Sequence, residues 1–310
     1  MWYMLEDYEK HLYHYTRASK LLDHILPRAR LRFSRFEFVN DPREAKDWVF
    51  SLQGSPADPN FDLRSLQTEL NRHIKHSWRI GCFVSDVREG CAPTRSDEPG
   101  KSVLGALYER GHSRPRMWAQ YGDDYRGACL IFDKARLGDA IKSAAIVNGL
   151  QMYSGKIRYE DTPTAVKLGR PNALTISIAE VNRSGFKIAA SNHLSRHWQD
   201  VFFVKQRDWE QEREFRWAVN VDTDEDFFVD IQGSLVGVLL GDRFDDSLKA
   251  RVGEFAVENG FEVAIMSWQN GVPQPQPTHG ELLREMGQRR GWTWKSLWQK
   301  VVSRAVNFTK

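Results

Sequence analysis

The sequence Trp209-Glu210-Gln211-Glu212-Arg213-Glu214-Phe215-Arg216-Trp217-Ala218-Val219 alternates between two kinds of side chain. Read with a period of two residues, its apolar side chains lie on one face, and the other face carries Glu212, Glu214 and Arg216. A helix is the alternative, but it would bring Glu210 and Glu214 together at a like-charge spacing. The alternation and the aromatic content therefore predict a half-buried strand.

The charged face of this predicted strand has two interpretations. Two carboxylates and a guanidinium in a row are typical of a solvated face, but they also suit the wall of a polar cleft. The stretch alone leaves both open. Polar residues near the ends of other predicted strands favour the cleft.

Composition indicates a globular protein. The chain has 310 residues, of which 41% are hydrophobic and 12% aromatic, enough to bury the core of one large domain or two small ones. The apolar run 235–240 is too short to span a bilayer, and residues 1–7 do not resemble a signal peptide. Three cysteines (Cys82, Cys91 and Cys129) cannot form a disulfide framework and indicate a reducing compartment. We therefore expect a cytoplasmic location and no membrane contact.

Predicted strands and helices are interspersed along the chain, which indicates an α+β fold. Residues 43–53 and 63–77 are expected to be helical, and residues 234–266 read as a strand, a helix and a second strand. We expect residues 1–270 to form a single α+β domain.

Residues 271–310 are expected to form a separate tail. Residues 271–277 contain alternate prolines and predict a stiff, extended linker. Beyond them, apolar residues such as Trp294 and Trp298 share one face of a predicted helix. This tail has seven basic residues against two acidic ones, whereas the whole chain has a net charge of +3. The helix either docks on the body of the protein or contacts nucleic acid or an acidic partner.

The common cofactor motifs are absent from the sequence. It contains no GxxxxGK[ST], no GxGxxG after a predicted strand, and no GxSxG. The pairs His73/His76 and His193/His197 lack the glutamate of a zinc-protease helix, and there is no CxxC pair. We therefore expect no bound metal.

A set of polar and aromatic residues near the ends of predicted strands remains as the candidate site. Each has an ordinary structural explanation when taken alone; a histidine between two tyrosines, for example, is more often a packing residue than a catalytic one. The set comprises His14, Thr16, Asn40, Asp41, Ser85, Trp118, Tyr121, Glu212, Glu214 and Arg216.

Five segments in this order resemble the bacterial family called domain of unknown function 2971. They cover about residues 12–266, and together they are more specific than any one of them. The Arg43-Glu44 pair is a minor departure, because an aromatic residue and an acid are expected there. The segments are Leu12–Thr16, Phe33-Ser34 with Asn40-Asp41-Pro42, Cys82–Ser85, Met117–Gly122 with Arg126-Gly127, and Lys205-x3-Trp209-x2-Glu212-x-Glu214-x-Arg216.

The order of an early histidine, a mid-chain tyrosine and a late glutamate also resembles the His-Tyr-Glu arrangement of ADP-ribosyltransferases. This resemblance implies a split β-sheet core with surrounding helices and a cleft that binds NAD as a substrate. It implies that Glu214 stabilises an oxocarbenium-like ribose and that Glu212 orients or deprotonates the acceptor. His14 and Tyr121 would complete the catalytic set.

The remaining residues would hold the NAD molecule. Tyr15, Thr16, Asn40 and Ser85 would lie beside His14 in the cleft, and Trp118 would stack on the nicotinamide ring with Tyr121. Arg126 or Arg216 would meet the pyrophosphate, or Arg216 would only position the two carboxylates.

The resulting functional expectation is an ADP-ribosyltransferase or NAD glycohydrolase. It would act on nucleic acid or protein as a bacterial effector, toxin or phage-defence protein. One alternative is a non-catalytic module that binds a nucleotide or nucleic acid, with phosphate contacts from the basic tail. Another is a metal-independent nuclease that uses His14 and Glu214 as acid and base.

Overall fold

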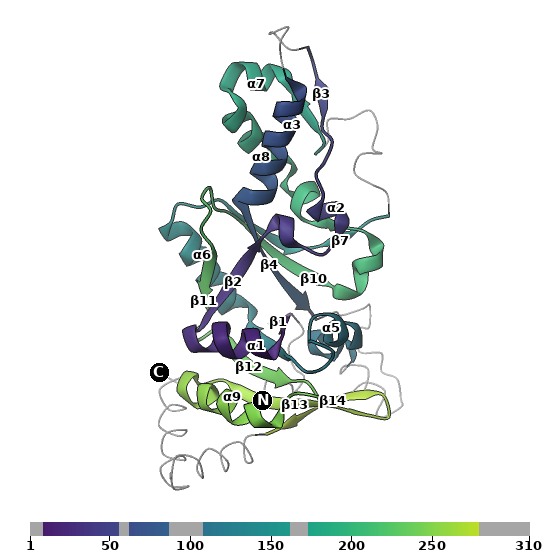
Figure 1. The fold of residues 1–310 in the computed structure, drawn as a ribbon, viewed down its shortest axis with the longest axis vertical. Helices are drawn as coiled ribbons and strands as arrows, with labels where there is room; N and C mark the ends of the chain where they lie inside the picture. The colour runs from purple at the N-terminus through teal and green to yellow at the C-terminus, as the bar shows by residue number, and fades with distance from the viewer. Residues whose placement is uncertain (1–8, 56–61, 87–107, 162–172, 279–310) are drawn as a thin grey trace. The chain divides into compact units, whose positions relative to one another are not determined.

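The computed structural model of the chain describes residues 9–55, 62–86, 108–161 and 173–278. These residues form a mixed α+β fold with a multi-strand mixed sheet, which confirms the expected class (Figure 1). The chain divides into two compact units of interleaved segments. Unit 1 comprises Met1–Leu31, Phe83–Ser143 and Val229–Lys310; unit 2 comprises Arg32–Cys82 and Ala144–Phe228.

Unit 1 is built on a strip of mainly antiparallel strands. The strand β1 (His11–Thr16) lies between the end of β4 (Trp78–Ser85) and β5 (Ala128–Asp133). The strip continues from β5 through β12 (Leu235–Leu240) and β13 (Glu262–Gln269) to β14 (Val272–Pro277). The pair β12–β13 is parallel, and the other pairs in the strip are antiparallel.

The β-α-β segment predicted near the C-terminal end is confirmed. Helix α9 (Asp246–Asn259) connects the parallel strands β12 and β13 (Figure 1). Asp245 caps this helix by accepting a hydrogen bond from the backbone N–H of Ser247, and Gly260 ends it with a φ of 78°. The buried run Val238–Leu240 explains why β12 lies inside the sheet.

Shorter helices complete unit 1. One run comprises α1 (Ala18–Lys20), the π-helical turn η1 (Leu21–Ile25) and the 3₁₀ turn η2 (Leu26–Arg28). A second comprises η4 (Gly111–Ser113) and α5 (Pro115–Gln120), and α6 (Lys134–Val147) follows β5.

The predicted linker is a strand of unit 1. Residues 272–277 form β14, which pairs with β13 along its whole length. The three prolines occupy alternate positions and oppose Trp268, Met266 and Ala264. At those positions the backbone nitrogen faces away from β13, so proline costs the ladder no hydrogen bond. The predicted helix after residue 278 lies outside the described residues.

Unit 2 contains β2 (Arg30–Arg35) from Arg32 onward, the first part of β4, β6 (Met152–Lys156) and β10 (Glu214–Asn220). β10 pairs with β4 and, antiparallel, with β6. β11 (Phe227–Asp230) follows β10 and pairs with β2. Two small parallel pairs join β3 (Ser51–Gln53) to β8 (Thr175–Ser177), and β7 (Arg158–Tyr159) to β9 (Val204–Lys205).

The helices of unit 2 are α2 (Pro42–Ala45), α3 (Leu63–Ser77), α7 (Ile178–Ser184) and α8 (Phe186–Phe202), with the 3₁₀ turns η3 (Phe36–Phe38) and η6 (Arg207–Glu212). The bounds of α3 match the predicted helix. α3 and α8 pack a shared core that includes Leu70, Ile74, Leu194 and Phe202.

Two local predictions in unit 2 were wrong. The helix expected over 43–53 ends at Ala45, and residues 51–53 form β3 instead. In the central stretch only residues from 214 onward form a strand, because residues 207–212 make the 3₁₀ turn η6 and Arg213 takes a left-handed φ of 47°. Glu212 therefore lies outside the strand, and the alternation of β10 does not determine where its side chain points.

Candidate functional site

Glu214 and Arg216 point to the same side of β10, as the alternation predicts, and their side chains form an ion pair. The distance from Arg216 Nε to Glu214 Oε1 is 2.7 Å, and that from Nη2 to Oε2 is 3.2 Å. Both side chains are buried: Arg216 is 0% exposed and Glu214 is 4% exposed. The charged face of the strand is thus neither solvated nor half-buried but enclosed within unit 2.

A second carboxylate, Glu44, holds the other edge of the same guanidinium. Arg216 Nη1 lies 2.5 Å from Glu44 Oε1, and Nη2 lies 3.1 Å from Oε2. Nη1 also donates to the carbonyl of Phe202 at 2.6 Å. An arginine has five N–H groups in a planar fork, and here the fork is shared between two carboxylates and a carbonyl.

The Asn40-Asp41-Pro42 segment brings Glu44 to this position. Asp41 caps α2 by accepting a hydrogen bond from the N–H of Arg43, and Pro42 occupies the first turn, where a missing N–H costs nothing. Glu44, in the same short helix, is 0% exposed. Two sequence segments about 170 positions apart therefore meet in one ion pair.

Lys205 bridges the two glutamates of the central stretch. Its ammonium nitrogen lies 2.7 Å from Glu212 Oε2 and 2.6 Å from Glu214 Oε2, and it lies 5.5 Å from the centre of the Trp209 ring. The turn η6 and the left-handed Arg213 bring Glu212 to Lys205. We call Glu44, Lys205, Glu212, Glu214 and Arg216 the buried ion network.

The network keeps Glu214 ionised. Burial opposes ionisation, but the nearby Arg216 and Lys205 charges outweigh it and lower the pKa of Glu214 to about 2. Burial raises the pKa of Glu44 despite Arg216. The backbone N–H of Glu214 donates to the hydroxyl of Tyr159 at 2.9 Å. At neutral pH, Glu214 is therefore a fixed anion rather than a proton carrier.

Cys82 borders the network. Burial raises the pKa of its thiol, the charge of Glu214 raises it further, and Arg216 and Lys205 oppose the change. Its thiol also forms a hydrogen bond with Glu214. Such a thiol is protonated and unreactive at neutral pH.

The predicted site residues on β1 divide between the two faces of the sheet in unit 1. His14 and Thr16 share a face with Ser85, which pairs with Leu12, and the His14 ring lies 5.6 Å from Phe83. Tyr15 faces the other way and contacts Trp118 at 5.1 Å between ring centres. Trp118 is fully buried, and its indole N–H donates to the carbonyl of His112.

Tyr121 packs against the same cluster as Tyr15 and Trp118. His14 lies on one face of the sheet, whereas Trp118 and Tyr121 pack against the other face with Tyr15. Trp118 is part of the core of unit 1, and the contacts of these three residues with nicotinamide stay predictions. Glu212, Glu214 and Arg216 belong to unit 2.

Two other predicted residues are exposed. Asn40 lies at the surface of unit 2 just before α2. Arg126 lies at the surface of unit 1, with its side chain 58% exposed, and its Nη1 is 3.8 Å from Asp124. It follows a turn in which Asp123, Asp124 and Tyr125 all have φ between 52° and 66°.

A buried polar cluster in unit 1 was missed by sequence reasoning. Asp86 accepts hydrogen bonds from Arg110 Nη1 at 2.9 Å and from the N–H of Gly111 at 2.8 Å, and Tyr13 also bonds to it. Burial lowers the pKa of the neighbouring His112 to about 3. Only the adjacency of Ser85 and Asp86 at the end of a predicted strand marked this position in the sequence.

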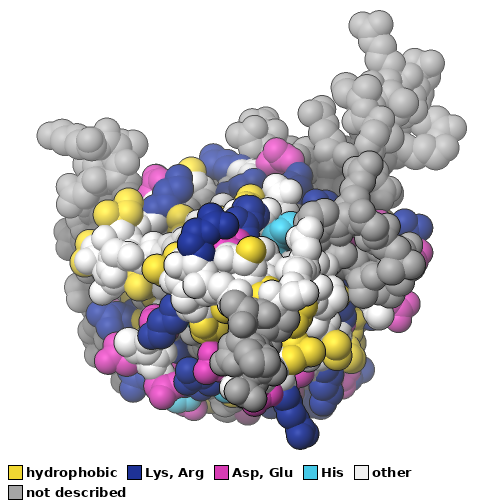
Figure 2. Space-filling model, turned by 90° about the horizontal axis from the view of Figure 1, so that it is seen from above, with side chains coloured by type: hydrophobic (Ala, Val, Ile, Leu, Met, Phe, Trp, Pro, Cys, Tyr) yellow, Lys and Arg dark blue, Asp and Glu magenta, His cyan; other side chains and the backbone are white. Residues whose placement is uncertain are grey.

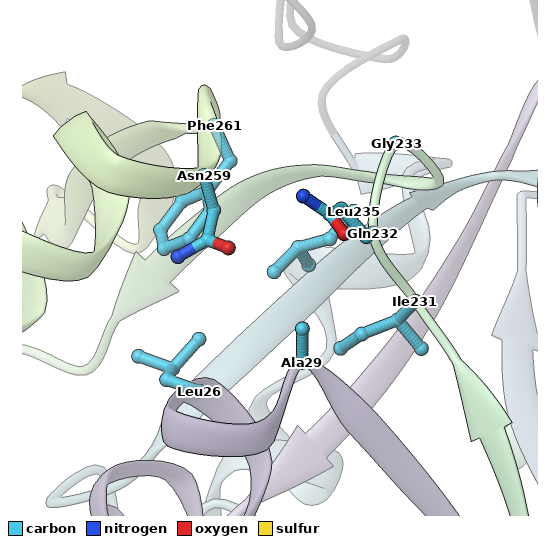
Figure 3. Close-up of a pocket in the computed structure, with 8 residues that line it drawn as sticks. All are labelled: Leu26, Ala29, Ile231, Gln232, Gly233, Leu235, Asn259 and Phe261. Carbon is cyan, nitrogen blue, oxygen red and sulfur yellow. The ribbon is translucent and has the colours of Figure 1, made fainter.

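A small pocket lies elsewhere in unit 1 (Figure 3). Its volume is about 270 Å³ including open solvent, and apolar side chains such as Leu26, Ile231 and Phe261 line it with the amides of Gln232 and Asn259. No predicted site residue lines it. In the part of the chain that the structure describes, no three His, Cys, Asp or Glu side chains are placed to share a metal ion.

One face of the described residues carries side chains of both charges. On the face shown in Figure 2, Lys and Arg side chains are interspersed with Asp and Glu, so no continuous basic surface is visible in that view. None of the described helices is both long and apolar enough to cross a bilayer.

Comparison with known proteins supports part of the family resemblance. A family model described as "Protein of unknown function (DUF2971)" matches residues 117–217. The match covers about a third of the chain and includes Trp118, Tyr121, Arg126 and the three charged residues at 212, 214 and 216. No curated protein matches the chain, and no solved structure matches it.

Proposed function

We propose that this protein cleaves the nicotinamide–ribose bond of NAD and passes ADP-ribose to an acceptor or to water. Glu214 is the carboxylate that stabilises the ribose. The observation that supports this proposal is the charge state of Glu214, because Arg216 and Lys205 lower its pKa to about 2 and fix its orientation.

The chemistry of the reaction needs such a group. Departure of nicotinamide leaves positive charge on the ribose, and an oriented anion in a site of low dielectric stabilises that charge more than the neutral ground state of the sugar. A carboxylate that is ionised at every physiological pH supplies this charge. It needs no proton transfer to do so.

The same property disfavours a nuclease that uses Glu214 as its acid or base. A general acid or base is most effective when its pKa lies near the working pH. The pKa of Glu214 lies several units below neutrality, so the group neither donates nor accepts a proton readily.

Substrate reaches Glu214 by replacing Lys205 in this proposal. Glu214 is 4% exposed, and the flexible Lys205 side chain contributes the ammonium that lies between Glu212 and Glu214. The cationic nicotinamide ribose takes the place of that ammonium and keeps the charge balance. Glu212, freed from Lys205, then orients the acceptor. An ADP-ribosyltransferase-like cleft and the roles of His14 and Tyr121 stay predictions.

The test is release of nicotinamide from NAD, measured by chromatography with the full-length protein. We expect turnover by the wild type and a loss of at least about 100-fold in Glu214→Gln, because the oriented anion is removed. Removing one partner of a buried ion pair costs about 3–5 kcal/mol, so circular dichroism must accompany the assay. Glu214→Asp keeps the negative charge but moves the carboxylate back by one methylene group, so nicotinamide release should also be slower than in the wild type.

The matched control is Glu180→Gln. Glu180 forms a two-point pair with Arg196 in the same unit, with distances of 2.6 and 3.3 Å, and it lies outside the buried ion network. This variant should retain wild-type turnover. A wild type that neither releases nicotinamide nor shows an NAD-dependent rise in melting temperature would refute the proposal.

A further inference from the structure

Glu44, a fully buried member of the buried ion network, takes no direct part in the proposed reaction. Glu44 is 0% exposed and makes two contacts with Arg216, of 2.5 and 3.1 Å. Arg216 in turn makes two contacts with Glu214, of 2.7 and 3.2 Å. The two carboxylates hold the guanidinium from different edges, so the position of each depends on the other.

The local structure fixes Glu44 more firmly than an exposed ion pair would. α2 is capped by Asp41, and the carbonyl of Glu44 accepts a hydrogen bond from the ammonium of Lys75. Lys75 itself lies over the rings of Phe36 and Trp48, at 4.9 and 4.3 Å. Backbone and side chain of Glu44 are therefore both anchored, and Arg216 has little freedom to rotate.

We infer that Glu44 is the positioning residue of the site: through Arg216 it fixes the orientation of Glu214. This inference rests on the proposed function for its catalytic consequence. This role links two segments that are distant in the sequence, because α2 supplies the carboxylate that holds Arg216 in place.

The competing explanation is that Glu44 serves only stability. The thiol of Cys82 separates the two, because its pKa responds to Arg216 and to Glu214. In Glu44→Gln, Arg216 loses one of its two carboxylates, and the potential at Cys82 becomes more positive. The thiol pKa should then fall. Loosening of the fold would lower it as well, because burial is the largest cause of the raised pKa. Leu70→Ala, which loosens the core of unit 2 without removing a charge, gives the size of that effect.

The experiment compares wild type, Glu44→Gln, Glu44→Asp, Leu70→Ala and the control Glu180→Gln. Alkylation of Cys82 by iodoacetamide is followed by mass spectrometry of its peptide from pH 8 to pH 12, because burial raises the pKa of this thiol well above its usual range, and nicotinamide release gives kcat and KM. We expect the alkylation midpoint of Glu44→Gln to fall further than that of Leu70→Ala, and its kcat to fall about 10- to 100-fold with a smaller change in KM. Glu44→Asp should restore part of both, and Glu180→Gln should change neither.

The outcomes distinguish the two proposals. An unchanged midpoint and an unchanged kcat in a folded Glu44→Gln protein would overturn the positioning role. Absence of nicotinamide release by the wild type would overturn the proposed function alone, since the thiol midpoint still reports whether Glu44 controls the charge around Glu214. A folded Glu44→Gln protein with a shifted midpoint but an unchanged kcat would restrict Glu44 to electrostatics and overturn its catalytic consequence.

Discussion

Lys75 is an amine enclosed by aromatic rings in unit 2. Its side chain is 2% exposed, and burial lowers its pKa from 10.5 to about 8, although Glu44 opposes the change. The unfolded chain therefore binds more protons than the folded chain between pH 8 and pH 10.5. In that window the free energy of unfolding gains a contribution that rises with pH.

Replacing Lys75 with methionine removes this contribution and keeps an unbranched side chain against Phe36 and Trp48. Relative to Lys75→Met, the wild type should gain about 3 kcal/mol of stability between pH 8 and pH 10.5. Urea unfolding at several pH values measures the difference. The exposed Lys46→Met is the control and should track the wild type; parallel curves for Lys75→Met and wild type would contradict the prediction.

At the scale of the element, the left-handed turn at 123–125 is held by close backbone contacts. Gly241 follows β12, and its N–H donates to the carbonyl of Gly127, while the N–H of Arg243 donates to the carbonyl of Tyr125. The Tyr125 ring stacks on Trp118 at 6.3 Å. Three residues in the left-handed region are costly, and these contacts are what stabilise the turn.

A methyl group at position 241 cannot be accommodated. A Cβ on Gly241 would collide with the backbone carbonyl of Tyr125, which cannot move without disrupting the turn. Gly241→Ala should therefore lower the free energy of unfolding by about 3 kcal/mol, as measured by urea titration. Gly155→Ala is the matched case, because the nearest atom to its Cβ would be 3.6 Å away, and it should be tolerated. Equal effects of the two substitutions would count against this account.

At the scale of the whole molecule, β14 is the last strand in the order that the described residues of unit 1 form, and its outer edge lacks donors at the proline positions. Its prolines at 273, 275 and 277 occupy the positions whose nitrogens face away from β13. An incoming strand would find carbonyl groups there but no N–H groups at these positions. Proline at such sites protects a sheet from pairing with another copy.

Replacing Pro273 and Pro275 together with valine restores two outward N–H groups on a β-prone edge. We expect the double variant to self-associate at concentrations at which the wild type does not, as measured by light scattering during size-exclusion chromatography. The control replaces Gln274 and Gln276 with valine. It adds the same two side chains at positions whose backbone N–H groups face β13, so it adds no outward donor. Equal association of both variants would indicate a side-chain effect instead.

The elements that could be predicted from the sequence are those set by local periodicity. Helix α3 has apolar residues at helical spacing over fifteen positions, and the segment from β12 to β13 carries strong strand, cap and glycine signals. The failures lie where distant contacts override local preference. The turn η6 replaces a predicted strand because Arg213 is left-handed, and the charged face of β10 is buried because Glu44 and Lys205 neutralise it.

The site was predicted in part for the same reason. The Glu214–Arg216 pair follows from strand alternation within one segment. Its partner Glu44, and the pair of Asp86 with Arg110 in unit 1, join residues that no short pattern connects. The side of β1 on which His14 lies depends on which face of the sheet α5 covers, and a single sequence does not specify that face.

The interleaving of the two units sets the order in which they can be completed during synthesis. Unit 2 has all its segments once residue 228 has left the ribosome, whereas unit 1 still lacks β12, α9, β13 and β14. Until these elements are translated, β5 has only β1 beside it and an open edge where β12 will pair. A nascent chain in which β5 has emerged and β12 has not therefore exposes a hydrophobic strand edge, and this is the interval in which a chaperone is most needed.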